Sequence, residues 1–261
     1  MRHAPRKRFG QHFLKDASIL SAIVDALAPR LGQVVVEIGP GLGALTAPLL
    51  QRVDHLLAIE IDRDLVARLR ARFPPERLVL HEADVLAFDF RALASDARLR
   101  LVGNLPYNIS SPLLIRLLDF RDCIEDLHFM LQKEVVQRIA ARPGTSDYGR
   151  LTVMMQAFHD VEHLFDVPPQ AFDPPPRVDS AVLRMMPRRA PLARDPKALE
   201  RVVSVAFGQR RKMIRGTLVP WLRQQGIDPD DPGFGLVPTA RPEEIAVERY
   251  GALADRLAPR T

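Results

Sequence analysis

The sequence predicts an α/β protein: a doubly wound parallel sheet of seven strands, followed by a small all-helical domain. Short apolar runs alternate with longer amphipathic runs from Val34 to about Met186, as strands and crossover helices do. The composition then changes at Pro187–Pro191, which has the proline and charge content of a linker. We therefore expect one domain over residues 1–187 and a second over 188–261.

The expected strands are short apolar runs, and the expected helices lie between them. The strands are Val34–Ile38, Leu56–Ile59, Leu78–His81, Leu99–Val102, Leu127–Leu131, Val161–Phe165 and Ala181–Met185. Helices are expected over Asp62–Arg72 with Asp62 as cap, over Pro112–Leu118 with Ser111 as cap, and over Lys133–Ala140. One more helical face runs from Ile19 to Leu27, behind Asp16.

The C-terminal part carries helical spacing and almost no strand signal. Helices are expected over Lys197–Phe207, Lys212–Gln224 and Glu243–Leu257. We find no internal repeat. This part is therefore expected to form a bundle of its own.

Composition narrows the class of protein. The chain has 261 residues, of which 47% are apolar, and no run approaches the length of a membrane span. Its basic N-terminus lacks the apolar block of a secretory signal, so we expect a cytoplasmic protein with no membrane contact. The single cysteine, Cys123, excludes an internal disulfide and the cysteine-based zinc motifs, and we expect no metal.

The basic residues cluster in two blocks. The formal net charge is +5. The first block, Met1–Lys15, contains no acidic residue and five basic ones: Arg2, Arg6, Lys7, Arg8 and Lys15. The second block, Arg184–Arg215, is strongly basic and contains only two acidic residues, Asp195 and Glu200. Such blocks suit a polyanionic partner, although a modest surplus is also common in proteins that bind no nucleic acid.

A glycine-rich turn follows the first expected strand. Gly39, Gly41 and Gly43 lie between Val34–Ile38 and a helix expected from about Ala44. Glycines let the backbone approach a ligand and expose amide donors at the helix start. Gly39, Gly41 and Ala44 also satisfy a dinucleotide-binding pattern, with Glu60 about where such proteins keep a ribose-binding acid, so the turn alone does not identify the cofactor.

Acidic residues follow the next two expected strands. Glu60 ends the second, and Asp84 follows the third. Because ligands lie across the carboxyl ends of a doubly wound sheet, both acids are expected to face the crevice of the glycine turn. Glu60 would accept ribose hydroxyls, and Asp84 an adenine amine. Strand-end acids are also frequent helix caps.

The most specific run is Asn104-Leu105-Pro106-Tyr107, after the fourth strand. The amine of adenine is a poor nucleophile because its lone pair is delocalised into the ring. Two acceptors, the Asn104 side-chain oxygen and the Leu105 carbonyl, would hold its hydrogens, with Pro106 stiffening the turn and Tyr107 stacking on the base. The run resembles the Asn/Asp-Pro-Pro-Tyr signature of methyltransferases that act on planar amines.

Three further runs resemble the KsgA-type small-subunit ribosomal RNA adenine dimethyltransferases. They are Arg6–Leu14, Phe172–Val182 and Ala206–Lys212. The resemblance implies a Rossmann-like class I methyltransferase fold and S-adenosyl-L-methionine as cofactor. Carried over by position, it implies cofactor contacts at His12, Leu14, Gly39, Glu60, Asp84 and Asn104, and a second base contact, beside Tyr107, at Phe172. The cluster Arg210, Arg211, Lys212 and Arg215 is expected either to contact phosphates of the substrate or to be an ordinary solvated surface.

The resemblance also implies the reaction. The expected activity is dimethylation of the N6 amines of two adjacent adenosines in a hairpin loop near the 3' end of 16S rRNA, coupled to ribosome biogenesis. The expected partner is the small ribosomal subunit, and the protein is expected to be a monomer. The alternatives are an adenine methyltransferase acting on large-subunit rRNA or DNA, a ribosome-assembly factor acting mainly by binding, and a nicotinamide dehydrogenase.

Overall fold

The computed structural model describes residues 12–94 and 97–258 of the chain. The chain forms two compact units. The first extends as far as Val136 and also takes in Glu162–Met186, and the second comprises Gln137–Val161 and the residues from Pro187 onward. The Arg6–Gln11 run and the basic residues ahead of it lie outside the described residues.

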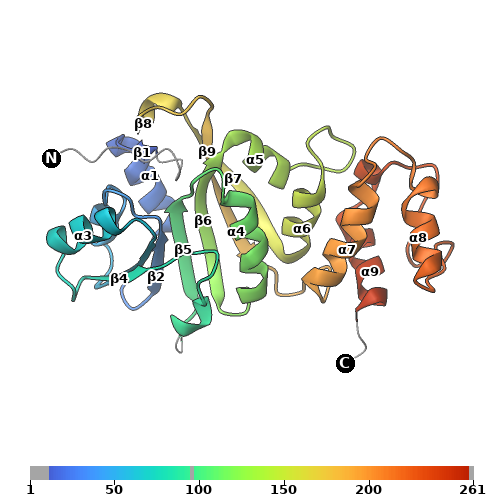
Figure 1. The fold of residues 1–261 in the computed structure, drawn as a ribbon, viewed down its shortest axis with the longest axis horizontal. Coiled ribbons are helices and arrows are strands. Elements are labelled where there is room, and N and C mark those ends of the chain that lie inside the picture. The colour runs from blue at the N-terminus through green and yellow to red at the C-terminus, as the bar shows by residue number, and fades with distance from the viewer. Residues whose placement is uncertain (1–11, 95–96, 259–261) are drawn as a thin grey trace. The chain divides into compact units, whose positions relative to one another are not determined.

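The fold contains a seven-stranded sheet, which confirms the α/β class expected from the sequence (Figure 1). Its strands stand in the order β4-β3-β2-β5-β6-β9-β7. All pairings from β4 to β6 are parallel, and β9 runs antiparallel to β6. The strands are β2 Val34–Ile38, β3 Leu56–Glu60, β4 Leu78–Glu82, β5 Leu99–Asn104, β6 Ile124–Gln132, β7 His159–Val167 and β9 Ser180–Pro187.

Helices follow most of the parallel strands. They are α1 Ala17–Leu27, α2 Thr46–Leu49, α3 Arg63–Arg72, α4 Ser110–Leu117 and α5 Lys133–Ile139, with 3-10 turns η2 Phe90–Ala92, η3 Leu118–Phe120 and η4 Pro169–Ala171. Asp16 and Asp62 cap α1 and α3 as expected. Ser111 is not the cap of α4, because the helix begins two residues earlier than expected, at Ser110, whose hydroxyl donates to the Pro106 carbonyl.

The apolar core of the first unit joins the sheet to its helices. Buried residues of α1, α2, β2 and β3 form one cluster, which also includes Leu14 and Phe172. These two residues belong to a short antiparallel pair, β1 Phe13–Leu14 with β8 Phe172–Asp173. The sequence did not indicate this pair, which ties the start of the described chain to the segment before β9.

The second unit is built mainly from helices. It contains α6 Arg150–Phe158, α7 Pro196–Phe207, α8 Leu218–Gln224 and α9 Val247–Leu257, with η5 Ile214–Gly216 and η6 Pro242–Glu244. The helix expected from Lys212 begins only at Leu218, and the one expected from Glu243 begins at Val247; in both cases a 3-10 turn precedes the helix. Helix α6 was not expected, since its N-cap, Gly149, has no capping side chain.

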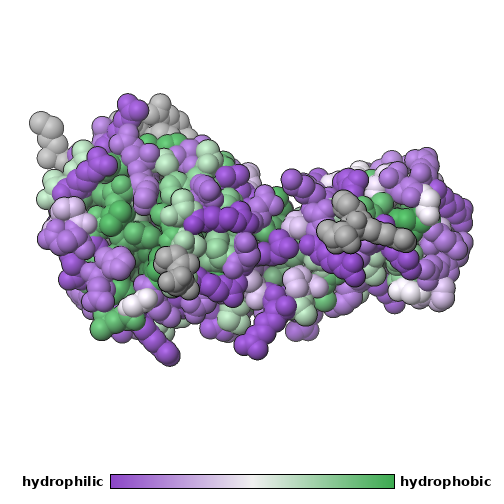
Figure 2. Space-filling view, turned by 90° about the horizontal axis from the view of Figure 1, so that it is seen from below, coloured by the Kyte–Doolittle hydropathy of each residue, from purple (hydrophilic) through white to green (hydrophobic). Residues whose placement is uncertain are grey.

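None of the described helices is long and apolar enough to cross a membrane. On the face shown in Figure 2, hydrophilic residues cover most of the surface, and apolar residues show among them mainly on the part that belongs to the first unit. Scattered exposed apolar residues of this kind are ordinary in globular proteins.

Candidate active site

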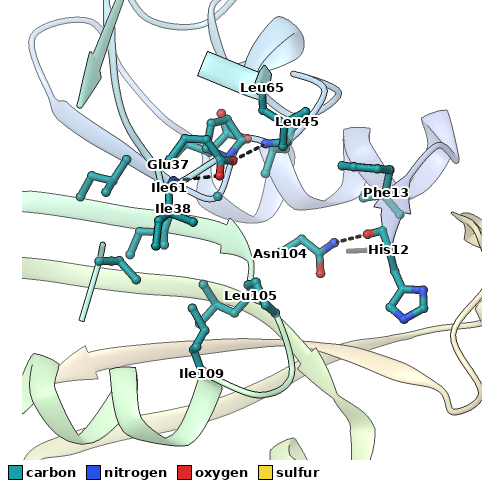
Figure 3. A pocket seen from close by; sticks show the side chains of 18 of the residues that line it. His12, Phe13, Glu37, Ile38, Leu45, Ile61, Leu65, Asn104, Leu105 and Ile109 are labelled. Carbon is teal, nitrogen blue, oxygen red and sulfur yellow. Dashed lines mark hydrogen bonds between the residues drawn. The ribbon is translucent and has the colours of Figure 1, made fainter. Parts of the chain in front are cut away.

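A cavity of about 340 Å³ opens at the carboxyl ends of the parallel strands of the first unit (Figure 3). Strand β2 lies between β3 and β5, so the chain crosses to opposite sides of β2 at this point. Ligands of doubly wound sheets bind at such a switch point. The lining includes every residue expected to contact the cofactor, namely His12, Leu14, Gly39, Glu60, Asp84 and Asn104.

The glycine turn after β2 forms one wall of the cavity. Gly39, Gly41 and Gly43 have φ of 67°, 58° and 77°, a left-handed conformation that side chains rarely adopt. At Gly41 an added Cβ would lie 3.2 Å from the ring of Phe13, whereas at Gly39 the nearest atom would be 3.9 Å away. The backbone at Gly39 is therefore open to a ligand, and Phe13 covers the turn beside it.

Glu60 holds the glycine turn to the end of β3. One carboxylate oxygen accepts from the backbone amide of Gly41 at 3.3 Å, and the other accepts from Ile61 and Asp62 at 2.9 Å each. The side chain is nearly buried, and burial raises the pKa of Glu60 above its ordinary value. A carboxylate held this way is preorganised to accept hydroxyls inside the cavity.

Glu37 is a second carboxyl group in the cavity wall, and the sequence had not singled it out as a site residue. It lies near the end of β2 and accepts a hydrogen bond from the Thr46 hydroxyl at 2.6 Å. Burial, followed by the neighbouring charge of Glu60, raises the pKa of Glu37 to about 8. Its position two residues before Gly39 was the only local signal, and its burial near Glu60 follows from the fold alone.

Glu82, which ends β4, and Asp84, which follows it, have different surroundings. Glu82 forms an exposed ion pair with Arg63 at 3.0 Å. Asp84 lines the cavity and accepts from the backbone amide of Leu86 at 2.9 Å, which fixes the turn it belongs to. Of these two acids, Asp84 is therefore the one whose carboxylate can contact a ligand in the cavity.

Asn104 ends β5 and projects toward the cavity. Its Nδ2 donates to the backbone carbonyl of His12 at 3.0 Å, and Figure 3 shows its amide oxygen turned away from His12. Because the nitrogen is committed to a carbonyl, the oxygen is the half of the amide available to accept from a ligand. This is the acceptor that the expected chemistry requires.

The loop after Asn104 has a defined shape. Leu105 donates its amide to Met130 of β6 at 3.1 Å, and Ile109 donates to the Pro106 carbonyl at 3.1 Å. Leu105, Pro106 and Tyr107 all line the cavity. The ring of His12 stacks on Tyr107, with centroids 5.9 Å apart and planes 29° apart.

Phe172, unlike Tyr107, does not line the cavity. It pairs with Leu14 in the β1–β8 ladder, and only 1% of its surface is exposed. Its side chain packs in the core of the first unit. Contact with a base would require this segment to move, and that role stays a prediction.

The three basic residues expected to contact RNA belong to the second unit and differ from one another. Arg211 and Lys212 are exposed. Arg210 is half-buried, pairs with Glu243 at 3.1 Å and donates to the carbonyls of Thr145 and Ser146. Arg210 therefore has a structural role within its unit, which the sequence did not indicate.

Three or more His, Cys, Asp or Glu side chains suited to hold a metal ion are not found together among the residues described. The cavity instead combines apolar walls, carboxylates and open backbone, a lining that fits a nucleoside-bearing cofactor.

Comparison with known proteins agrees with this arrangement. A family model described as ribosomal RNA adenine dimethylase matches residues 2–228. Ribosomal RNA small subunit methyltransferase A of Laribacter hongkongensis is 56% identical over 98% of this chain and 97% of its own length. Among solved structures, a dimethyladenosine transferase from Plasmodium falciparum has a TM-score of 0.78 at 24% identity, covering 93% of this chain and 96% of that one. The 23S rRNA methyltransferase ErmE has a TM-score of 0.70 at 27% identity, covering 94% and 99%. The chain belongs to the ribosomal RNA adenine dimethylase family, as its sequence motifs led us to expect.

Proposed function

We propose that this protein dimethylates the N6 amines of two adjacent adenosines in a hairpin loop near the 3' end of small-subunit rRNA. The observation that carries the proposal is the orientation of Asn104, whose amide oxygen is left to accept from a substrate amine. Family membership and the name of the Laribacter relative support the choice of small-subunit RNA.

The cofactor is S-adenosyl-L-methionine, which supplies an electrophilic methyl group on a sulfonium. Gly39 and its turn would hold the donor close to the backbone, Glu60 would accept ribose hydroxyls, and Asp84 would accept the adenine amine of the cofactor. His12 and Leu14 lie on the side of the cavity closed by the β1–β8 pair. All these proposed contacts belong to the first unit.

The chain's own contribution to the reaction is placement of the amine. Asn104 Oδ1 and the Leu105 carbonyl would each accept one N–H of the target amine, so that its lone pair points at the methyl group. Tyr107 would stack on the base after it leaves its helix. Arg211 and Lys212 would contact phosphates and position the RNA without reading its sequence.

We infer that the protein acts in the cytoplasm, as a monomer, on the small ribosomal subunit or its assembly intermediates. The reaction is expected to require no metal.

The similarity to ErmE favours a second candidate, methylation of an adenine in large-subunit rRNA. The two are separated by offering the purified protein labelled S-adenosylmethionine with small subunits, large-subunit RNA or duplex DNA. Transfer to small subunits alone, recovered as dimethyladenosine by nucleoside mass spectrometry, is the expected result. Transfer to large-subunit RNA instead would overturn the proposal.

Asn104→Ala tests the assigned chemistry. Removing the acceptor is expected to lower methyl transfer by at least about 100-fold, while binding to small subunits survives. Undiminished transfer would refute the mechanism. If the same variant fully restored a strain lacking the gene, the protein would act mainly as an assembly factor.

A further inference from the structure

A hydrogen bond joins Tyr107, in the loop after β5, to Ser180, the first residue of β9. The two hydroxyl oxygens are 2.9 Å apart, and either can donate. The partners are 73 positions apart in the chain. Ser180 is not one of the residues that line the cavity.

The sheet explains why β9 reaches the site. Ser180 stands opposite Gln132, the last residue of β6, and Asn104 stands opposite Met130 of the same strand. Because β9 is antiparallel to β6, its amino end lies at the edge where the parallel strands have their carboxyl ends. Ser180 thus enters the active-site edge from a strand, which is more rigid than a loop.

Both ends of Tyr107 are consequently fixed. Its backbone belongs to the turn held by the Leu105 and Ile109 hydrogen bonds. Its phenol is held by Ser180, which is fully buried. The hydroxyl keeps its proton at neutral pH, because the ordinary pKa of a tyrosine is about 10 and burial raises the pKa of Tyr107 further. A ring fixed in this way is presented to a base without the entropic cost of ordering it.

We propose that Ser180 is a positioning residue for the methyl transfer: its hydroxyl sets the orientation of the Tyr107 ring on which the target adenine stacks. The inference rests on the proposed function, because it assigns Tyr107 to the base. Binding of the whole RNA depends mainly on phosphate contacts elsewhere. Loss of the Ser180 hydroxyl should therefore lower kcat and leave KM for small subunits nearly unchanged.

A double-mutant cycle tests the proposal. Ser180→Ala and Tyr107→Phe each remove one partner, and each is expected to lower kcat about 3- to 10-fold, the value of one hydrogen bond. The double variant should be no slower than the slower single variant, because both changes remove the same bond. Wild-type kcat in Ser180→Ala, or independent losses that multiply in the double variant, would overturn the proposal.

Thr152→Val serves as the matched control in the second unit. Thr152 is also fully buried, and its hydroxyl donates to the Arg138 carbonyl, so the change removes a buried hydroxyl that does not belong to the unit of Tyr107. Its kcat should stay at the wild-type level. A loss equal to that of Ser180→Ala would mean that reduced stability alone explains the effect.

A measurement independent of activity keeps this inference separate from the proposed function. The chain has three tyrosines, so protein labelled with 3-fluorotyrosine gives a simple fluorine NMR spectrum, and Tyr107→Phe assigns one signal. Ser180→Ala should shift that signal, and an unchanged signal would overturn the positioning role. Failure of the wild-type protein to methylate small subunits would reject the proposed function without altering this result.

Discussion

Asn104 and His12 are joined by a hydrogen bond from the Asn104 side-chain nitrogen to the His12 carbonyl, at 3.0 Å and across 92 positions of the chain. His12 directly precedes β1, and β1 is paired with β8. The orientation of the Asn104 amide therefore depends on the segment His12–Leu14, which is distant in the sequence and lines the same cavity. An acceptor set in advance needs no reorganisation when the substrate amine arrives.

Asn104→Asp tests this dependence. The variant keeps an acceptor but places a carboxylate oxygen against the His12 carbonyl, so the side chain should turn away. We expect the rate of methyl transfer to fall at least about tenfold, roughly 1.4 kcal/mol, measured under saturating substrate. Thr152→Val, in the second unit, is the control for a general loss of stability. A wild-type kcat in Asn104→Asp would show that the contact with the His12 carbonyl does not set the orientation of Asn104.

Glu37 predicts a dependence of stability on pH. Its pKa is about 8 in the folded protein, against 4.5 as the ordinary value, so between these limits the folded state holds a proton that the unfolded chain has lost. The stability contributed is complete below pH 4.5 and is lost as pH rises through 8. The slope is at most about 1.4 kcal/mol per pH unit.

Glu37→Gln keeps a hydrogen-bonding partner for Thr46 and cannot ionise. Its free energy of unfolding, measured with urea at pH 5, 6.5 and 8, should therefore decline less than that of the wild-type protein. The advantage of the variant should be largest at pH 8. Parallel curves for the two proteins would contradict the raised pKa.

A buried ion pair between Arg100 and Asp126 is expected to dominate the stability of the β5–β6 region. Both side chains are about 90% buried, and Arg100 also donates to the Leu27 carbonyl at 2.7 Å. Removing one partner leaves a buried charge alone, so Asp126→Asn should cost about 3–5 kcal/mol in urea unfolding. The exposed pair Arg91–Asp122 gives the control. Asp122→Asn should cost under about 1 kcal/mol, and equal costs would contradict the effect of burial.

Local patterns were sufficient to predict the positions of the seven strands. Most strands contain an apolar run bounded by polar residues, and β7, which carries several charged residues, is the exception. A parallel sheet necessarily gathers its strand ends at one edge. The helix caps Asp16 and Asp62 were equally local. Glu60, Asp84 and Asn104 were found because strand-end positions follow directly from the strand assignments.

Features that depend on distant partners could not be predicted. The β1–β8 pair has only two residues in each strand, too few for a periodic signal. Glu37 looks like any strand acid until the fold buries it beside Glu60. The contact of Ser180 with Tyr107 depends on β9 running antiparallel, and the pairing of Arg210 with Glu243 joins residues 33 positions apart.

Gly251 is expected to be required for the close packing of α9, a part of the chain for which the sequence indicated only helical character. It lies inside α9, where replacing glycine with alanine ordinarily stabilises a helix by about 1 kcal/mol. Here an added Cβ would lie 1.8 Å from the Leu192 carbonyl oxygen, which is backbone and cannot move aside alone. Gly251→Ala should therefore destabilise the second unit by about 2–4 kcal/mol in urea unfolding. Gly216→Ala is the control, because its Cβ would meet nothing within 4 Å. The cavity residues belong to the first unit. S-adenosylmethionine binding, measured by calorimetry at low temperature, should therefore persist in Gly251→Ala. A gain in the free energy of unfolding of Gly251→Ala would refute the close contact with Leu192.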